Sequence, residues 1–341
     1  MKKVLALVLS FIMIFTLVSC GDSTSSDATS TDGLEEVTIN FYNPVAGTVT
    51  DASIDLFAQK VEELSDGKIT VDITPAGTLG AEREATQLIQ LGDIDMSVLS
   101  IDGLEWLCPN EAFWLCLPGL LTSWEDVDAY NDGWMFEAHQ KYAAENGIDL
   151  ICPGEFGLKA FLGTGDAIKT FEDFEGKVIR VPDVDLNQDW IKALGAMPIS
   201  GIDMYTGLQQ GTMDAVHNNI PASELFKLEE VIDWVTLTWD MYGTNYYVAN
   251  KDFTDGLSDA AKEIIYQASE EAAQYIRDEY RGTYETWIQK CKDQGIEVTE
   301  IDDEFRAKLQ EASYTIWDKY RDKYPAEVMD KIYEEYYPGN N

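Results

Sequence analysis

A regular alternation of strand and helix patterns near the start of the chain constrains its fold more than any other sequence feature. Strand patterns occupy residues 37–42, 69–73 and 95–100, and amphipathic helix patterns occupy 50–64 and 82–91 between them. Strand–helix–strand connections favour parallel pairing of the strands, with the helices packed on the faces of the sheet. The sequence therefore predicts an α/β fold with a largely parallel sheet in this region.

The remainder of the chain adds two connecting elements. An aromatic, β-rich run at 235–247 is a candidate crossover strand between domains. Residues 257–294 form one helical pattern, interrupted only by Gly282, and because it is longer than an ordinary globular helix we expect it to bridge two domains. The other predicted elements are strands at 148–153 and 160–163, a helix at 303–324 and a short turn at 330–337.

The first twenty residues have the pattern of an export signal. Two lysines precede an apolar run that has about the length of a signal-peptide core and is short for a membrane span. The run ends at Ser19 and Cys20, which resembles a bacterial lipobox, where the cysteine carries the lipid. We expect a signal peptide at 1–19 and a lipidated, flexible tether at 20–33. An ordinary signal peptide or an uncleaved anchor is the alternative.

The chain is very acidic. It has 24 Lys and Arg against 62 Asp and Glu, and removal of the two signal-peptide lysines would leave 22 against 62, a net charge of −40. Such a charge argues against a nucleic-acid partner and against electrostatic docking on anionic lipid. An anionic ligand would have to approach against this field, so its site would need a local positive charge.

Four cysteines follow the tether, namely Cys108, Cys116, Cys152 and Cys291. No CxxC pair or Cys/His cluster has the spacing of metal ligands, so we expect no metal site and no cofactor. Buried free thiols are the simplest interpretation, although an extracytoplasmic location would also permit disulfides.

The segment from 176 to 219 is the most informative about function. A short apolar strand ends at Arg180 in the run RVP, and two helix patterns then lead to Asp214 and Asn218. An arginine keeps its charge and can hold a carboxylate with two parallel hydrogen bonds. A strand-end arginine in such an acidic protein is therefore a candidate clamp for an anionic ligand. A structural ion pair with one of the many carboxylates is the alternative.

In order and spacing, these pieces resemble the solute receptors of TRAP transporters, the DctP-type family that captures organic acids outside the cell. The resemblance covers nearly the whole mature chain. Its motifs are the run GKITVDITPAGTLGAEREATQLIQLGDIDMSVLS, the Leu-Pro pair at 117–118, RVP, and the Asp214-to-Asn218 pattern, which lacks the family's glycine. The resemblance implies a two-lobed, periplasmic-binding-protein-like α/β fold with a long bridging helix, a small carboxylated solute as ligand, and TRAP membrane subunits as partners.

Two lobes are also expected from length, because about 300 residues follow residue 33 and one compact core rarely holds so many. We predict lobe I from residues 34–157 plus 244–283 and lobe II from residues 158–243 plus 284–339. Ligands bind open α/β sheets beyond the carboxyl ends of their strands. Arg180, Asn43 and Ser100 all fall at or near predicted strand ends, which supports a binding cleft.

The resemblance assigns roles to residues of the predicted lobe II. The family's arginine pairs with the ligand carboxylate, which makes Arg180 the main candidate, and Asn218 matches an asparagine that could donate to the same carboxylate. Asn218 could instead cap a turn or a helix. Lys159 stands where the family has a second arginine; it keeps the charge without the planar fork, or is simply a surface lysine. His217 stands at a usual carboxylate position and could make binding pH-sensitive, or be a hydrogen-bonded neighbour.

Further candidates come from lobe I and from the crossover. Asn43 and Glu82 match positions that line the family's cleft. Asn43 is also a good turn residue, and Glu82 could accept hydrogen bonds from ligand hydroxyls or an amine, or pair with a nearby arginine. Ser100 is another lining candidate. Trp239 and Tyr242 could stack on an apolar or aromatic ligand, or pack in a hinge.

These observations favour a lipid-anchored, extracytoplasmic solute receptor that closes on an organic acid and presents it to a membrane transporter. An ABC-type binding lipoprotein for sugars or cations is the alternative, since an acidic, aromatic-rich surface would suit such ligands. An enzyme is not expected, because the chain has only two histidines, His139 and His217, and contains no GxSxG, HExxH or Cys–His signature of a catalytic site. No catalytic residue is therefore assigned.

Overall fold

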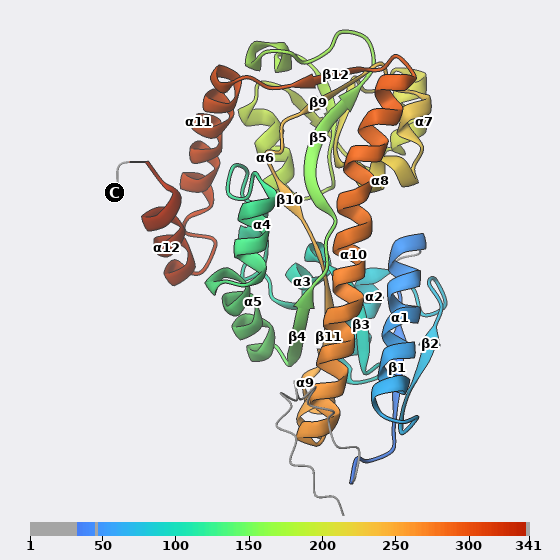
Figure 1. The fold of residues 1–341 in the computed structure, drawn as a ribbon. Coiled ribbons are helices and arrows are strands. Elements are labelled where there is room, and N and C mark those ends of the chain that lie inside the picture. Colours follow the sequence, from blue (N-terminus) through green and yellow to red (C-terminus); the bar gives the residue numbers. More distant parts are fainter. Residues whose placement is uncertain (1–32, 45–46, 339–341) are drawn as a thin grey trace, which may run out of the picture. The chain divides into compact units, whose positions relative to one another are not determined.

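Two β-sheets with helices packed around them make up the part of the chain that this computed structural model describes, residues 33–44 and 47–338 (Figure 1). The predicted mixed α/β fold is therefore confirmed. The predicted signal peptide, the lipidated Cys20 and nearly all of the tether lie outside the described residues. Within the described ranges, no helix is long and apolar enough to cross a membrane.

The first sheet has the strand order β2-β1-β3-β11-β4. Its strands are β1 (Val37–Tyr42), β2 (Ile69–Thr74), β3 (Met96–Ser100), β4 (Ile148–Pro153) and β11 (Asn245–Asn250). β1 pairs parallel with β2 and β3, as expected, but β11 runs antiparallel to both β3 and β4. The expectation of a largely parallel sheet is therefore correct only for the first three strands, because β11 enters this sheet on its return from the second one.

The second sheet has the order β12-β9-β5-β8-β6-β7, with β10 paired to β5. Its strands are β5 (Gly157–Gly163), β6 (Val178–Arg180), β7 (Met197–Ile199), β8 (Ala215–Asn219), β9 (Trp234–Leu237), β10 (Tyr242–Gly243) and β12 (Glu297–Glu300). β5 starts immediately after the crossing from β4, and Lys159 at its start is paired with Asn219 at the end of β8. This end of the sheet therefore lies next to the crossing.

Helices connect and cover these strands. In chain order they are α1 (Thr48–Leu64), α2 (Glu82–Leu91), α3 (Ile101–Leu107), α4 (Trp124–Asn131), α5 (Trp134–Glu145), α6 (Asp185–Ala193), α7 (Met204–Gln210), α8 (Ile220–Leu225), α9 (Lys251–Asp255), α10 (Asp259–Asp293), α11 (Asp303–Tyr320) and α12 (Ala326–Tyr336), with short 3-10 turns at Phe113–Cys116, Phe171–Phe174 and Leu228–Glu230. The four cysteines after the tether are all buried and free, so the thiol interpretation is correct.

The predicted crossover strand at 235–247 is broken into β9, β10 and β11. Trp239 has φ +48°, a left-handed conformation that interrupts an extended strand. The following residue, Asp240, is buried and accepts a hydrogen bond from Trp190 on α6. The break thus follows from a long-range contact that the local β-rich pattern does not contain.

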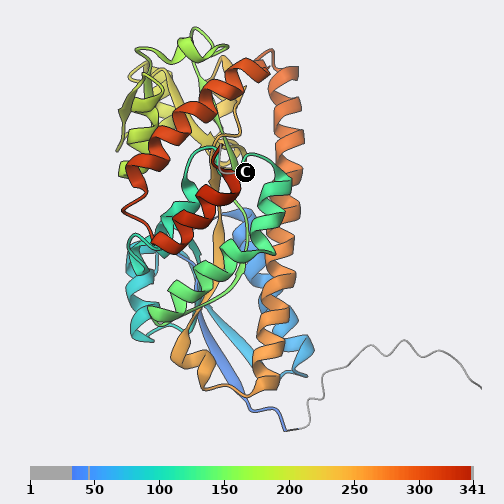
Figure 2. The same cartoon turned by 90° about the vertical axis from the view of Figure 1, so that its left-hand side faces the viewer.

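The long helix α10 has 35 residues and confirms the predicted bridging helix. It packs on α1 and β4 of the first sheet and on α8 and β12 of the second (Figures 1 and 2). It begins after Ser258, whose hydroxyl caps it by accepting from the Ala261 amide, and α9 precedes it as a separate helix.

The C-terminal helices α11 and α12 also connect elements around both sheets (Figure 2). α11 packs on α6, whereas Tyr142 of α5 donates to Glu327 of α12 at 2.8 Å. An 11-residue helix thus replaces the short turn expected here, because its apolar face packs against α11 around Trp317. The predicted lobe II includes α12, which contacts α5 of the predicted lobe I. The lobe boundaries remain a prediction.

Candidate functional site

Arg180 is a half-buried cation for which the described residues supply no ion pair. It ends β6, and among the described residues no carboxylate lies within 4.0 Å of it. Its buried Nε has no hydrogen-bond partner in the described part of the chain. Burial lowers the pKa of Arg180, and the charge of Asp203 opposes this shift. Asp203 itself caps α7 by accepting from the Thr206 amide at 2.8 Å, and within the described part of the chain it does not come within ion-pair distance of Arg180.

Asn218 lies on the same face of the second sheet as Arg180. Arg180 is opposite Val216 on β8, and side chains two residues apart on a strand share a face. The Asn218 amide has only a long contact, 3.7 Å, to the sulfur of Met204 on α7. The helix-cap role falls to the next residue, since Asn219 accepts from the Ala222 amide of α8 at 3.0 Å. Asn218 thus shares a sheet face with Arg180 and does not serve as the helix cap.

Lys159 projects from the other face of this sheet. It is opposite Asn219, and its Nζ lies 3.5 Å from Asn187 Oδ1 of α6 and 3.4 Å from Met241 Sδ. It is partly buried, so it is not a simple surface lysine. Burial raises the pKa of Asp102 on α3, and the charge of Lys159 opposes that shift. Arg180 and Lys159 thus share the same end of the sheet but approach it from opposite faces.

His217 is a buried, hydrogen-bonded neighbour of this region. Its Nε2 lies 3.1 Å from Asp240 Oδ2, and its ring stacks on Phe161 with centroids 4.4 Å apart. Burial lowers the pKa of His217, although the Asp240 carboxylate opposes the shift. These contacts fit the neighbour interpretation that the sequence left open.

The candidates from the first sheet lie near the ends of β1 and β3, where Glu82 and Ser100 contact each other. Glu82 accepts hydrogen bonds from the amide and hydroxyl of Ser100, whose Oγ in turn caps α3. Burial raises the pKa of Glu82. Asn43 directly follows β1, is 3% exposed, and its Nδ2 contacts Asp51 Oδ1 at 2.5 Å. Arg83 lies over the ring of Trp106 instead of pairing with Glu82.

Trp239, which is partly buried, and Tyr242, which is fully buried, both pack against rings of other elements. The Trp239 ring lies 5.4 Å from that of Tyr284 on α10, and Tyr242 is fully buried with its ring 6.3 Å from that of Tyr130 on α4. Trp239 also borders a surface groove with Lys292, away from Arg180. A fully buried ring has no free face for a ligand, so packing accounts for Tyr242 in this conformation.

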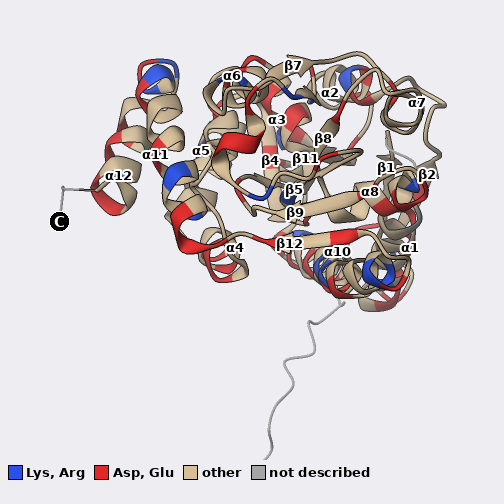
Figure 3. Cartoon of the chain, turned by 90° about the horizontal axis from the view of Figure 1, so that it is seen from above, with Lys and Arg blue, Asp and Glu red and all other residues tan. Residues whose placement is uncertain are grey.

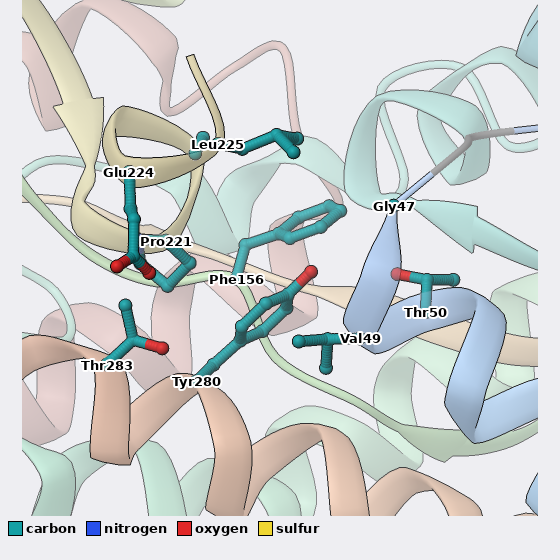
Figure 4. A pocket seen from close by; sticks show the side chains of 10 residues that line it. Gly47, Val49, Thr50, Phe156, Pro221, Glu224, Leu225, Tyr280 and Thr283 are labelled. Atoms are coloured by element: carbon teal, nitrogen blue, oxygen red, sulfur yellow. The ribbon is translucent and has the colours of Figure 1, made fainter. Parts of the chain in front are cut away.

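Sequence reasoning missed a pocket of about 250 Å³ at the crossing between the sheets (Figure 4). In Figure 4 the rings of Phe156 and Tyr280 lie between residues of α1 and residues of α8. The lining residues are Gly47, Val49, Thr50, Phe156, Pro221, Ala222, Glu224, Leu225, Tyr280 and Thr283. None of the predicted ligand residues lines this pocket. Two of its lining residues lie close to predicted ligand residues in the sequence, since Gly47 is four residues after Asn43 and Pro221 is three residues after Asn218.

A second cavity, of about 190 Å³, lies on the Lys159 side. Glu105 of α3, Leu186 of α6 and Tyr324 beyond α11 contribute to its walls. Leu186 precedes Asn187, which contacts Lys159. Over the ranges described, no group of three or more His, Cys, Asp or Glu is arranged to hold a metal ion.

Comparisons with known proteins agree with this architecture. A solute-binding protein from Chromohalobacter salexigens is 26% identical over 317 residues, which cover 92% of this chain and 91% of that protein. The C4-dicarboxylate-binding periplasmic protein DctP of Rhodobacter capsulatus is 25% identical over 304 residues, which cover 87% of this chain and 90% of that protein.

A TRAP periplasmic solute-binding protein from Ochrobactrum anthropi has a similar crystal structure, with a TM-score of 0.82, 28% identity, and coverage of 88% of this chain and 95% of that one. In that structure a C-terminus is bound in the ligand-binding pocket. The family model of bacterial extracellular solute-binding proteins, family 7, matches residues 42–323. Since this match spans most of the chain, the protein belongs to the DctP family of bacterial extracellular solute-binding proteins.

Proposed function

We propose that this protein is an extracytoplasmic receptor that binds an organic acid through its carboxylate and delivers it to a TRAP membrane transporter. The observation that carries this proposal is the half-buried guanidinium of Arg180, which has an unpartnered Nε among the described residues. An uncompensated cation in a partly desolvated position is costly, and a bound carboxylate would offset that cost.

The similar proteins support a carboxylate as the recognised group. The Rhodobacter relative is named for binding C4-dicarboxylates, and the Ochrobactrum structure has a C-terminus in its ligand pocket. A free chain terminus carries a carboxylate, so the same chemistry would suit both ligands.

In the proposed complex, Arg180 holds the carboxylate with its planar fork and Asn218 donates from the same sheet face. Lys159 adds positive charge from the other face, so a ligand that contacts both cations has to extend around the end of the sheet. Asn43, Glu82 and Ser100 would complete the wall from the first sheet. A carboxylate that contacts both sheets binds the closed form of the receptor more tightly than the open form. This difference in affinity drives closure.

We also propose that a lipid on Cys20 anchors the receptor to the outer face of the cell membrane. The support is the sequence alone: a basic start, an apolar run and a small residue before the cysteine. In cell fractionation, Cys20→Ala is expected to move the protein from the membrane fraction to the soluble one. An unchanged membrane fraction would contradict lipid anchoring through this residue.

A thermal-shift screen of residues 34–341 tests the ligand class. Organic acids, their methyl esters, sugars and amino acids are compared, because a ligand that binds only the folded state raises the melting temperature. We expect an acid to stabilise the wild type and Arg306→Ala, an exposed control, but not Arg180→Ala. Equal stabilisation by an acid and its ester would refute carboxylate recognition.

Two other outcomes separate the remaining interpretations. A sugar or cation that stabilises both the wild type and Arg180→Ala would favour the ABC-type receptor. The ligand found in the screen is then identified chemically after the protein has been denatured. A receptor releases this ligand unchanged, whereas an enzyme would release a product.

A further inference from the structure

Two chain segments cross between the sheets side by side. Residues 154–156 lead from β4 to β5, and residues 243–245 span the junction between β10 and β11, where Thr244 joins the two strands. They are bonded to each other, since the Gly154 amide donates to the Asn245 carbonyl at 2.7 Å and the Phe156 amide donates to the Gly243 carbonyl at 3.0 Å. A movement of one sheet relative to the other has to be accommodated in these short segments and in the bridging helix α10.

The long helix α10 holds the first of these segments. Three side chains spaced four and three residues apart, and therefore on one helix face, contact it in order. Arg277 donates to the Pro153 carbonyl, Arg281 donates to the Glu155 carboxylate with Nη2 at 2.9 Å, and Tyr284 donates to the Leu158 carbonyl at 2.6 Å. The crossing is thus fixed to α10 along its whole length.

Glu155 is the unusual member of this set because its carboxylate is fully buried, with 0% exposure. Its partner Arg281 is less buried, with 28% of its side chain exposed, and it divides its charge between Glu155 and Asp128 of α4, which it contacts at 2.6 Å. The amide group of Asn245, on the other crossing segment, is buried and has no hydrogen-bond partner in the described structure. Glu155 therefore lies in a poorly solvated interior next to an unsatisfied amide, and Arg281 is the side chain that donates to both of its carboxylate oxygens.

We propose that Glu155 is a proton-linked hinge residue: its neutral form favours packing of the crossing segments on α10, and its ionisation favours their opening. This inference goes beyond the proposed receptor function, because it concerns the connection between the sheets and needs no ligand.

The charges around Glu155 determine the direction of this effect. Burial is the largest influence and raises the pKa of Glu155 to about 7. Arg281 and Arg277 of α10 lower it and Asp128 of α4 raises it, while Tyr242 of β10 and Tyr284 of α10 are the other titratable groups that face it. The packed form therefore binds the proton more tightly than an opened form, so opening increases as the pH rises from the ordinary carboxylate range to about 7, and then levels off.

Hydrogen exchange of the Gly154 and Phe156 amides, corrected for intrinsic rates, tests the proposal in the ligand-free full-length protein. Between pH 5 and 7 we expect the opening constant to rise about tenfold per unit in the wild type, with a plateau above. Glu155→Gln should remove this dependence. Asp128→Asn is the matched control: it keeps Glu155 and should move the plateau to lower pH, because a like charge is removed. The same slope in Glu155→Gln, or no slope in the wild type, would overturn the proposal.

A second measurement does not depend on any variant folding. The carboxyl carbon of Glu155 is followed by ¹³C chemical shift as the wild type is titrated. A midpoint well above the ordinary glutamate range supports the proposal, and an ordinary midpoint contradicts it. Neither result bears on carboxylate recognition by Arg180, because no ligand is present.

Discussion

Arg180 and Glu155 are two charges removed from water in different ways. Arg180 is half-buried and lacks an anionic partner among the described residues, whereas Glu155 is fully buried and has one. In the first case a ligand can supply the missing charge. In the second, burial outweighs the ion pair, which is why the pKa of Glu155 is raised despite Arg281.

Arg180→Lys tests the geometry of recognition separately from its charge. Lysine retains the positive charge but loses the planar fork, so one of two charge-assisted hydrogen bonds is lost, worth roughly 1.5–3 kcal/mol. We expect the dissociation constant of the acid found by screening to increase about 10- to 100-fold by titration calorimetry. Arg306→Lys is the matched control and should bind as the wild type does. An unchanged constant in Arg180→Lys would mean that charge alone suffices.

Glu155→Gln is expected to change how stability depends on pH. The folded-state pKa of Glu155 is about 7 against a usual 4.5, so its proton stabilises the fold below pH 4.5 and this contribution is lost as the pH rises through 7. The loss amounts to roughly 3 kcal/mol. In urea unfolding, the variant should therefore gain stability relative to the wild type between pH 5 and 8. A constant difference over that range would contradict the raised pKa.

Among the elements, those with strong local patterns could be predicted closely. β1 and α2 occupy the predicted residues, and α2 ends at Gly92, which has the left-handed φ of 75° expected of a helix-ending glycine. The break at Trp239 and the helix α12 could not be predicted. Both depend on contacts with distant residues, Asp240 with Trp190 in one case and α12 with α11 in the other.

The candidate site shows the same division. The strand-end positions of Arg180 and Ser100 could be predicted because they follow from where the strands end. That Arg180 and Lys159 lie on opposite faces of the second sheet could not be predicted, because it depends on the strand register across β6, β8 and β5. The pocket around Phe156 likewise depends on how α1, α8 and α10 come together.

Gly282→Ala tests the long helix as an element. A Cβ at this position meets no atom within 4 Å, and glycine in a helix interior costs about 0.5–1 kcal/mol relative to alanine. We therefore expect a gain of that size in the free energy of unfolding, measured with urea. Gly157→Ala should do the reverse, because Gly157 has φ +92° and its Cβ would overlap the Tyr284 hydroxyl. A loss of stability in Gly282→Ala would show that α10 requires glycine at this position.

At the scale of the whole molecule, negative charge dominates. Acidic residues are spread over many elements and basic residues are fewer (Figure 3), and the formal net charge of the full chain is −38. An anionic solute is therefore repelled until it is close to the cations of the site. Salt weakens this repulsion, because the screening length falls from about 30 Å at 0.01 M to about 8 Å at 0.15 M ionic strength.

The association rate constant of an acid is accordingly expected to rise when salt is increased over that range. Stopped-flow fluorescence, using the intrinsic tryptophans, measures it. An uncharged ester or sugar analogue serves as the control where it binds. A rate constant that falls with salt would show that the local field of Arg180 and Lys159 outweighs the global charge.

The strand order of the first sheet also determines when that sheet can be completed. β11 lies between β3 and β4, yet it is made of residues 245–250, after nearly all of the second sheet has been synthesised. Until then, β3 and β4 have no strand between them and each presents an unpaired edge, a feature that promotes aggregation. The first sheet can therefore be completed only after residues 245–250 have been made, and the edges of β3 and β4 stay open while most of the second sheet is synthesised.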